Sequence, residues 1–196
     1  MLKNIILIYP SFERGGVKEN FLNYIKTFSN KRFNLFLISD HNLSKYILKK
    51  KNIKICIIKK NKFNILYKYL MSFYAACELY KLKNLYDKKN SRVISFQSSF
   101  FSSIICKLLG YKLIIRVSED PIGATKYADN FLLSRLILLS KIVTYNLSYK
   151  VFANSKIMKN NLKKLVFNKK KITLLYNMNF VKILKNKITI QNFRWN

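Results

Sequence analysis

A pair of glycines lies in the first loop of the sequence, within residues 11–18 (SFERGGVK). Gly15 and Gly16 come between an apolar run of strand length and a segment with helical spacing. Glycine lets the backbone take positive φ and approach a ligand closely, and the N–H groups at a helix start attract a phosphate or a sugar hydroxyl. The spacing is neither a dinucleotide fingerprint nor a Walker loop. The segment therefore predicts a ligand-binding loop or an ordinary glycine turn.

A second group of charged side chains follows a later apolar run, in the segment IRVSEDP. Arg116 stands at the end of that run in a chain with only 8 acidic residues. Its guanidinium suits a phosphate contact, or a pair with Glu119. Glu119 and Asp120 either have a functional role or only form structural ion pairs with Arg116 or Lys126.

Strand and helix patterns alternate along the chain and would position these residues. Apolar runs of strand length cover residues 4–10, 33–39, 53–58, 92–96, 111–117, 150–153 and 171–175. Helical patterns cover residues 17–28, 42–50, 64–85, 98–109, 130–147 and 155–166. Gly110 suits a left-handed helix end, and Asn154 or Ser155 suits an N-cap.

This alternation predicts an α/β fold, a Rossmann-like doubly wound parallel sheet of six or seven strands between helix layers. Ligands bind such sheets outside the carboxyl ends of the strands. The loops at 10–17, 96–99, 117–129 and 153–156 are therefore expected to share one edge.

The composition indicates a folded, strongly basic protein. Half of the residues are hydrophobic, and 38 Lys and Arg against 8 Asp and Glu give a net charge of +30. Such a charge favours a polyanionic partner. We expect an anionic membrane surface rather than nucleic acid, because the basic residues are spread along the chain and no nucleic-acid-binding motif is present.

The remaining residue types indicate an intracellular chain without a metal. The three cysteines are far apart in apolar runs and predict buried thiols in a reducing compartment. His41 is the only histidine, which excludes a histidine-rich zinc site. The first apolar run lacks a secretory cleavage site, and the stretch 131–147 is too short and too charged for a confident membrane span.

Three segments, taken in order, resemble the family 4 glycosyltransferases of the GT-B fold. IILIYPSFERGGVKENFLNYIKTF resembles the first strand, glycine pair and helix of that family. KVFANSKIMKNNLKKL and KKITLLYN resemble the unit that closes its first domain. IRVSEDPIGATKYAD resembles the R-x-S-E-x-P loop of members that act on cell-surface polysaccharide or lipopolysaccharide. The resemblance covers about residues 4–180 and rests on the order of elements. It implies an acceptor-side N-terminal domain at 1–178, followed at 179–196 by a linker or a truncated second domain.

The resemblance also implies roles for particular residues. Ser118 stands where many members have a histidine in the acceptor cleft, so a polar or acid–base role falls to Glu119 or Asp120. Gln97 follows the fourth strand, where the family lines its acceptor pocket; a neighbour of a helix cap is the alternative. The expected catalytic residues are Ser118, Glu119 and Asp120, and the expected donor- and acceptor-binding residues are Arg14, Gly15, Gly16, Gln97, Arg116 and Ser155. For Arg14, a solvated loop is the alternative.

The implied function is transfer of a sugar from a nucleotide-sugar donor to a lipid-linked or polysaccharide acceptor, at the inner face of the cell membrane. The resemblance implies no metal and no other cofactor. It places the donor-holding glutamates in the second domain, and residues 178–196 contain no acid. We therefore expect the chain to be inactive alone and to need a separate C-terminal domain. The alternative is a non-catalytic basic α/β module that binds anionic membrane or nucleic acid.

Overall fold

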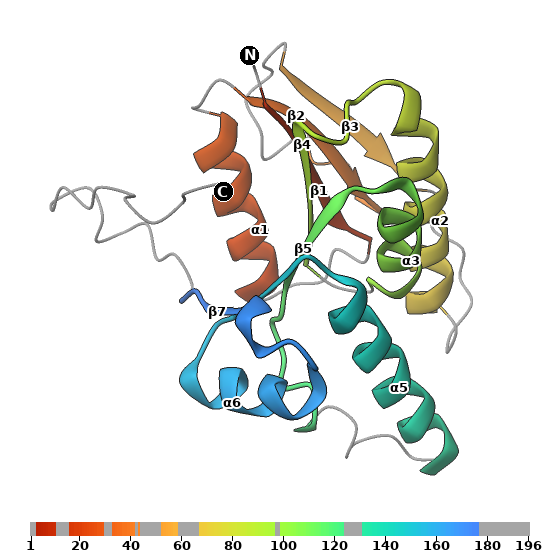
Figure 1. Cartoon of the computed structure of the whole chain (residues 1–196). Coiled ribbons are helices and arrows are strands. Elements are labelled where there is room, and N and C mark those ends of the chain that lie inside the picture. The colour runs from red at the N-terminus through yellow and green to blue at the C-terminus, as the bar shows by residue number, and fades with distance from the viewer. Residues whose placement is uncertain are drawn as a thin grey trace, which may run out of the picture.

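The computed structural model describes residues 3–10, 16–29, 33–41, 43, 52–58, 67–96, 99–123 and 131–176. Seven strands form one sheet, and every pairing in it is parallel (Figure 1). They are β1 (Lys3–Tyr9), β2 (Phe33–Ser39), β3 (Ile53–Ile57), β4 (Ser91–Ser95), β5 (Lys112–Arg116), β6 (Lys150–Ala153) and β7 (Ile172–Leu174). The predicted doubly wound parallel sheet is confirmed, with a strand at each of the predicted apolar runs.

The strand order is β3-β2-β1-β4-β5-β6-β7, so the direction of winding reverses between β1 and β4. From β1 the chain proceeds outward to β2 and β3, and from β4 it proceeds outward in the opposite direction. Crossovers between parallel strands are right-handed, so the two halves send their helices to opposite faces. Sheets of this kind bind ligands at the carboxyl edge, beside the point where the winding reverses, which here is the carboxyl edge between β1 and β4.

The central strand β1 shows why the apolar runs are continuous. Successive side chains of a strand point to opposite faces, and both faces of this sheet are covered. Ile5, Leu7 and Tyr9 belong to the core under α1 (Gly16–Ser29), whereas Ile6 and Ile8 belong to the core on the other side. A strand buried on both faces needs an apolar residue at every position.

The second core is covered by the remaining helices. These are α2 (Tyr67–Lys81) with the short helix η2 (Leu82–Asn84), α3 (Phe100–Leu109), α5 (Phe131–Leu147) and α6 (Lys156–Leu165), which is followed by η3 (Lys169–Lys171). Figure 1 shows α1 on one side of the sheet and α2 beside α3 on the other, with α5 extending away from the sheet below them. The predicted helix at 42–50 falls almost wholly outside the described residues.

Two helix ends that the sequence predicted are confirmed by the structure. Gly110 ends α3 in the left-handed region with φ 76°, a conformation that favours glycine. Ser155 is the N-cap of α6, and its hydroxyl accepts a hydrogen bond from the backbone N–H of Met158 at 3.1 Å. This cap satisfies one of the N–H groups that a helix start leaves without a partner inside the helix.

Candidate functional site

The carboxyl edge of the sheet collects residues from distant parts of the chain. Because all seven strands are parallel, the segments after β1, β5 and β6 emerge at the same edge. Gly16, Ser118, Glu119 and Ser155 stand on these segments. Three other predicted site residues, Arg14, Gly15 and Gln97, lie outside the described residues. The functional roles assigned to all of these residues stay predictions.

The sequence predicted that Gly16 lies in a loop whose backbone takes positive φ, and the structure shows otherwise. It is the first residue of α1, and Gly110 is the glycine with positive φ in the described part of the chain. A β-carbon built at Gly16 would meet no atom within 4 Å. The first residue of a helix takes ordinary helical torsions, so the described structure gives Gly16 no steric need to be glycine.

A pocket of about 310 Å³ opens beside the end of β5. Its walls come from the end of β4, the segment after β5 and the helices α2, α3 and α5. The lining residues are Tyr69, Ser72, Phe96, Ser99, Phe100, Ile115, Arg116, Val117, Ser118, Glu119, Ile137, Ser140, Lys141, Thr144 and Tyr145. Apolar side chains, hydroxyl groups and one lysine–glutamate pair therefore share this cavity.

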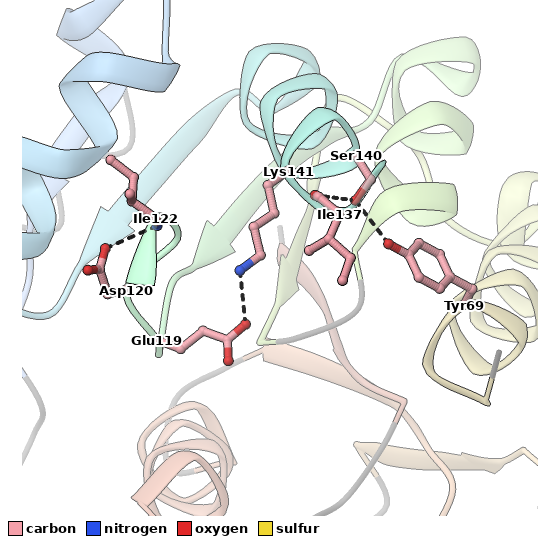
Figure 2. Close-up of polar contacts among 7 residues, drawn as sticks. All are labelled: Tyr69, Glu119, Asp120, Ile122, Ile137, Ser140 and Lys141. Atoms are coloured by element: carbon pink, nitrogen blue, oxygen red, sulfur yellow. Dashed lines mark hydrogen bonds and ion pairs between the residues drawn. The ribbon is translucent and has the colours of Figure 1, made fainter. Parts of the chain in front are cut away.

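The ion pair of the pocket joins Lys141 of α5 to Glu119, with 3.3 Å between Nζ and Oε1 (Figure 2). Only 16% of the lysine side chain is exposed, against 63% of the glutamate side chain. The lysine thus belongs to the wall, and the carboxylate reaches from solvent toward it. From the sequence, Arg116 or Lys126 was the expected partner of Glu119; the structure gives Lys141 as a partner, and Lys126 lies outside the described residues.

Asp120 is engaged on the other side of its loop, away from the ion pair (Figure 2). Its carboxylate accepts hydrogen bonds from Asn161 Nδ2 at 3.0 Å and from the backbone N–H of Ile122 at 3.2 Å. Partial burial raises the pKa of this carboxyl group, but the hydrogen bonds from Asn161, Ile122 and Gly123 and the charge of Lys141 outweigh burial and hold the pKa below its ordinary value. These contacts give Asp120 a part in shaping the turn.

Arg116 is almost fully buried, with 2% of its surface exposed. Its Nη1 donates a hydrogen bond to the carbonyl oxygen of Leu175, which follows β7. Burial lowers the pKa of Arg116, and the neighbouring Tyr24 opposes this effect. Arg116 thus fixes the end of β7 to the end of β5, and its contact with a phosphate stays a prediction.

Hydroxyl groups on the pocket walls are held by hydrogen bonds. The hydroxyls of Tyr69 and Ser140 lie 3.3 Å apart, and Ser140 also donates to the carbonyl oxygen of Ile137 at 2.8 Å (Figure 2). Thr144 donates to the carbonyl oxygen of Ser140 at 2.6 Å. Such oriented hydroxyls suit a ligand that offers hydroxyl groups of its own.

The sequence did not lead to the prediction that α5 forms part of the pocket wall. Ile137, Ser140, Lys141 and Thr144 follow the spacing i, i+3, i+4, i+7, which places them on one face of a helix. Three of the four are polar within a segment that is otherwise mostly apolar. That polar face was the available signal, but in the sequence Lys141 was interpreted as a charge that interrupts the apolar stretch or extends from a core-facing helix to solvent.

Two features are absent from the part of the chain that the structure describes. No group of three or more His, Cys, Asp or Glu side chains is placed there to hold a metal ion. None of the helices described is both long enough and apolar enough to cross a bilayer.

No protein-family model matches the sequence, and no curated protein matches it either. Solved structures match the fold at low identity. Anabaena HepE in complex with UDP and glucose has a TM-score of 0.61 at 12% identity over 89% of this chain and 44% of its own. UDP-N-acetylglucosamine 2-epimerase from Rickettsia bellii has a TM-score of 0.60 at 11% identity over 90% and 45%. UGT2 of Phytolacca americana, complexed with UDP-2-fluoro-glucose and pterostilbene, has a TM-score of 0.64 at 10% identity over 94% and 56%. The chain thus has the Rossmann-like fold found in GT-B proteins, and it spans about half the length of these neighbours.

Proposed function

We propose that this chain is the acceptor-side domain of a family 4-like glycosyltransferase. The reaction would transfer a sugar from a nucleotide-sugar donor to a lipid-linked or polysaccharide acceptor in cell-surface glycan synthesis, including that of lipopolysaccharide. The observation that carries the proposal is the 310 Å³ pocket at the carboxyl end of β5, which combines fixed hydroxyl groups with the Lys141–Glu119 pair. Pockets at this edge are the usual ligand sites of α/β sheets.

Each charged group of the pocket has a part in the proposed reaction. The carboxylate of Glu119 accepts the proton of the attacking acceptor hydroxyl, because it is exposed at the mouth of the pocket. Lys141 holds that carboxylate in place and adds positive charge for a phosphate of donor or acceptor. Ser118 lines the same wall and offers a hydroxyl contact to the acceptor.

In the proposed reaction the donor is held by a second domain. The chain spans 44% of HepE and 56% of UGT2, whose crystals contain UDP and a UDP sugar analogue respectively. We propose a nucleotide-sugar donor bound by a C-terminal domain. The chain alone would be inactive, because holding donor and acceptor in line can account for about 7–11 kcal/mol of barrier lowering.

The test is a transfer assay with labelled nucleotide sugars and membrane extract, run on the chain alone and with a candidate C-terminal domain. Turnover is expected only in the mixture. Glu119→Gln should then reduce turnover by about 10²- to 10⁴-fold, which is the usual contribution of general acid–base catalysis. Glu78→Gln is the matched control, because Glu78 pairs with Lys81 at 2.6 Å and does not line the pocket.

Turnover by the chain alone would contradict the need for a second domain. Equal loss in Glu119→Gln and Glu78→Gln would contradict the assignment of Glu119. Absence of turnover in every mixture would favour the alternative function, a non-catalytic basic module. For either function we propose a cytoplasmic protein that binds the anionic inner face of the membrane peripherally, since the net charge of +30 favours such a surface.

A further inference from the structure

The helix α5 has two faces with different surroundings. One face carries Ile137, Ser140, Lys141 and Thr144 and lines the pocket. Positions on an α-helix advance by about 100° per residue. Residues at other angles around the helix point away from the pocket, and their surroundings indicate what else the helix contacts.

The outward side of α5 is apolar and exposed. Phe131, Leu132, Leu136 and Leu139 are exposed over 74%, 65%, 54% and 57% of their surface. We call these four residues the leucine face. Leu132, Leu136 and Leu139 follow the spacing i, i+4, i+7 and form one stripe, and Phe131 lies beside it at the start of the helix. Three leucines on one stripe with a phenylalanine beside them form an apolar patch, which marks an interaction site more often than scattered exposed residues do.

The leucine face lies at the same edge of the molecule as the pocket. α5 connects β5 to β6 and so runs opposite to the strands, which places its first turns toward the carboxyl edge. Figure 1 shows α5 extending away from the sheet. A surface that contacts the leucine face would therefore be close to the mouth of the pocket.

The charges decide which partner suits this patch. The guanidinium of Arg135 lies 4.9 Å from the centre of the Phe131 ring, and α5 contains no acidic residue. A second copy of the chain would bring two molecules of charge +30 together, which is electrostatically unfavourable. An anionic bilayer accepts both the apolar side chains and the positive charge.

We infer that the leucine face of α5 inserts into the interfacial layer of an anionic membrane. The neighbouring face of the same helix then presents the pocket to a substrate held at the membrane surface, which assigns the acceptor to the lipid-linked class. This assignment of the acceptor rests on the proposed glycosyltransferase function, whereas the lipid contact itself does not.

The test compares the unchanged chain with one triple-substituted variant and one double-substituted control variant. Each is measured for binding to vesicles of phosphatidylcholine with phosphatidylglycerol. Leu132→Gln, Leu136→Gln and Leu139→Gln are combined in one variant, since glutamine keeps the length and helix preference of leucine. The matched control combines Leu85→Gln and Leu108→Gln, which change leucines that are 71% and 75% exposed outside α5. Circular dichroism and thermal unfolding check that both variants fold.

The triple variant should bind the anionic vesicles at least tenfold more weakly than the unchanged chain, and the control should bind within about twofold of it. Binding of the unchanged chain should weaken as salt rises, because exposed charges are screened beyond about 10 Å at 0.1 M salt. Unchanged binding by the folded triple variant would overturn the inference, as would equal loss in the control or equal binding to vesicles of phosphatidylcholine alone. Sedimentation that shows self-association lost in the triple variant would assign the face to a second copy and also overturn it.

These outcomes are separate from those of the transfer assay. Loss of vesicle binding in the triple variant supports the lipid contact even if no sugar is transferred. Turnover that depends on Glu119 supports the proposed function even if the vesicle experiment fails.

Discussion

Substitution of Asp120 distinguishes a structural role from a catalytic one. Its carboxylate accepts hydrogen bonds from Asn161 at 3.0 Å, from Ile122 at 3.2 Å and from the backbone of Gly123. A hydrogen bond to a charged group contributes about 1.5–3 kcal/mol net, and a neutral one about 0.5–1.5 kcal/mol. The side chain is only partly buried, so water replaces part of what is lost. We expect Asp120→Ala to lower the free energy of unfolding by about 2 kcal/mol, and Asp120→Asn by about 1 kcal/mol.

The effect of Asp120→Asn should depend on pH in a definite direction. The pKa of Asp120 in the folded chain lies below the ordinary value of 3.8. A lowered pKa contributes stability that is fully present above the unfolded value and is lost as pH falls through the folded value. The stability difference between the unchanged chain and Asp120→Asn should therefore be constant above about pH 5 and shrink below about pH 4.

Urea unfolding followed by circular dichroism at pH 7, 5 and 3.5 measures this difference. At pH 7 the melting temperature of Asp120→Ala should fall by about 4–8 °C, since 1 kcal/mol corresponds to about 2–4 °C in a chain of this size. Equal stability of the two proteins at pH 7, or a difference that grows on acidification, would refute the reasoning. In the transfer assay with a C-terminal domain, a loss of turnover above 100-fold in folded Asp120→Asn, far below its melting temperature, would support the catalytic role that the sequence predicted for Asp120.

Three further substitutions test the contacts that hold the carboxyl edge together. Arg116→Met removes the buried donor to the carbonyl of Leu175 and should lower the free energy of unfolding by about 2–3 kcal/mol; unchanged urea unfolding would show that this contact does not hold β7. Tyr24→Phe removes a buried hydroxyl that has no hydrogen-bond partner among the described residues, so the free energy of unfolding should rise by up to about 1 kcal/mol, and a clear fall would reveal a partner. Ser155→Ala removes the cap on the N–H of Met158 and should lower the free energy of unfolding by about 1 kcal/mol, which a comparison with Ser155→Asn, another good cap, would check.

The fold was predictable because its signals are local. A strand buried on both faces must be apolar at nearly every position, so the seven strands of the parallel sheet were visible as seven short apolar runs. Gly110 and Ser155 were visible as helix ends because the backbone torsion and the capping hydrogen bond each depend on a few neighbouring residues. From parallel pairing alone it followed that the loops after β1, β5 and β6 share one edge.

The contacts of the candidate site were decided by the tertiary structure. Glu119 and Asp120 are adjacent in sequence, yet one pairs with Lys141 and the other with Asn161, 22 and 41 residues further along. Nothing local determines which neighbour each carboxylate meets. The sequence had offered Arg116 or Lys126 as a partner, but Arg116 is buried against the carbonyl of Leu175, and Lys126 lies outside the described residues.

By itself, then, the sequence determined which segments are strands and helices, their parallel arrangement and the edge at which a ligand would bind. Only the tertiary structure decided which side chains line the pocket and which leucines of α5 stay exposed. The physical reason lies in the range of the interactions. A strand buried on both faces must be apolar along its own length, and a short apolar run in the sequence shows this directly. The exposed side of a helix such as α5, whose apolar residues are not confined to one face, is set by the segments that pack against it from elsewhere in the chain.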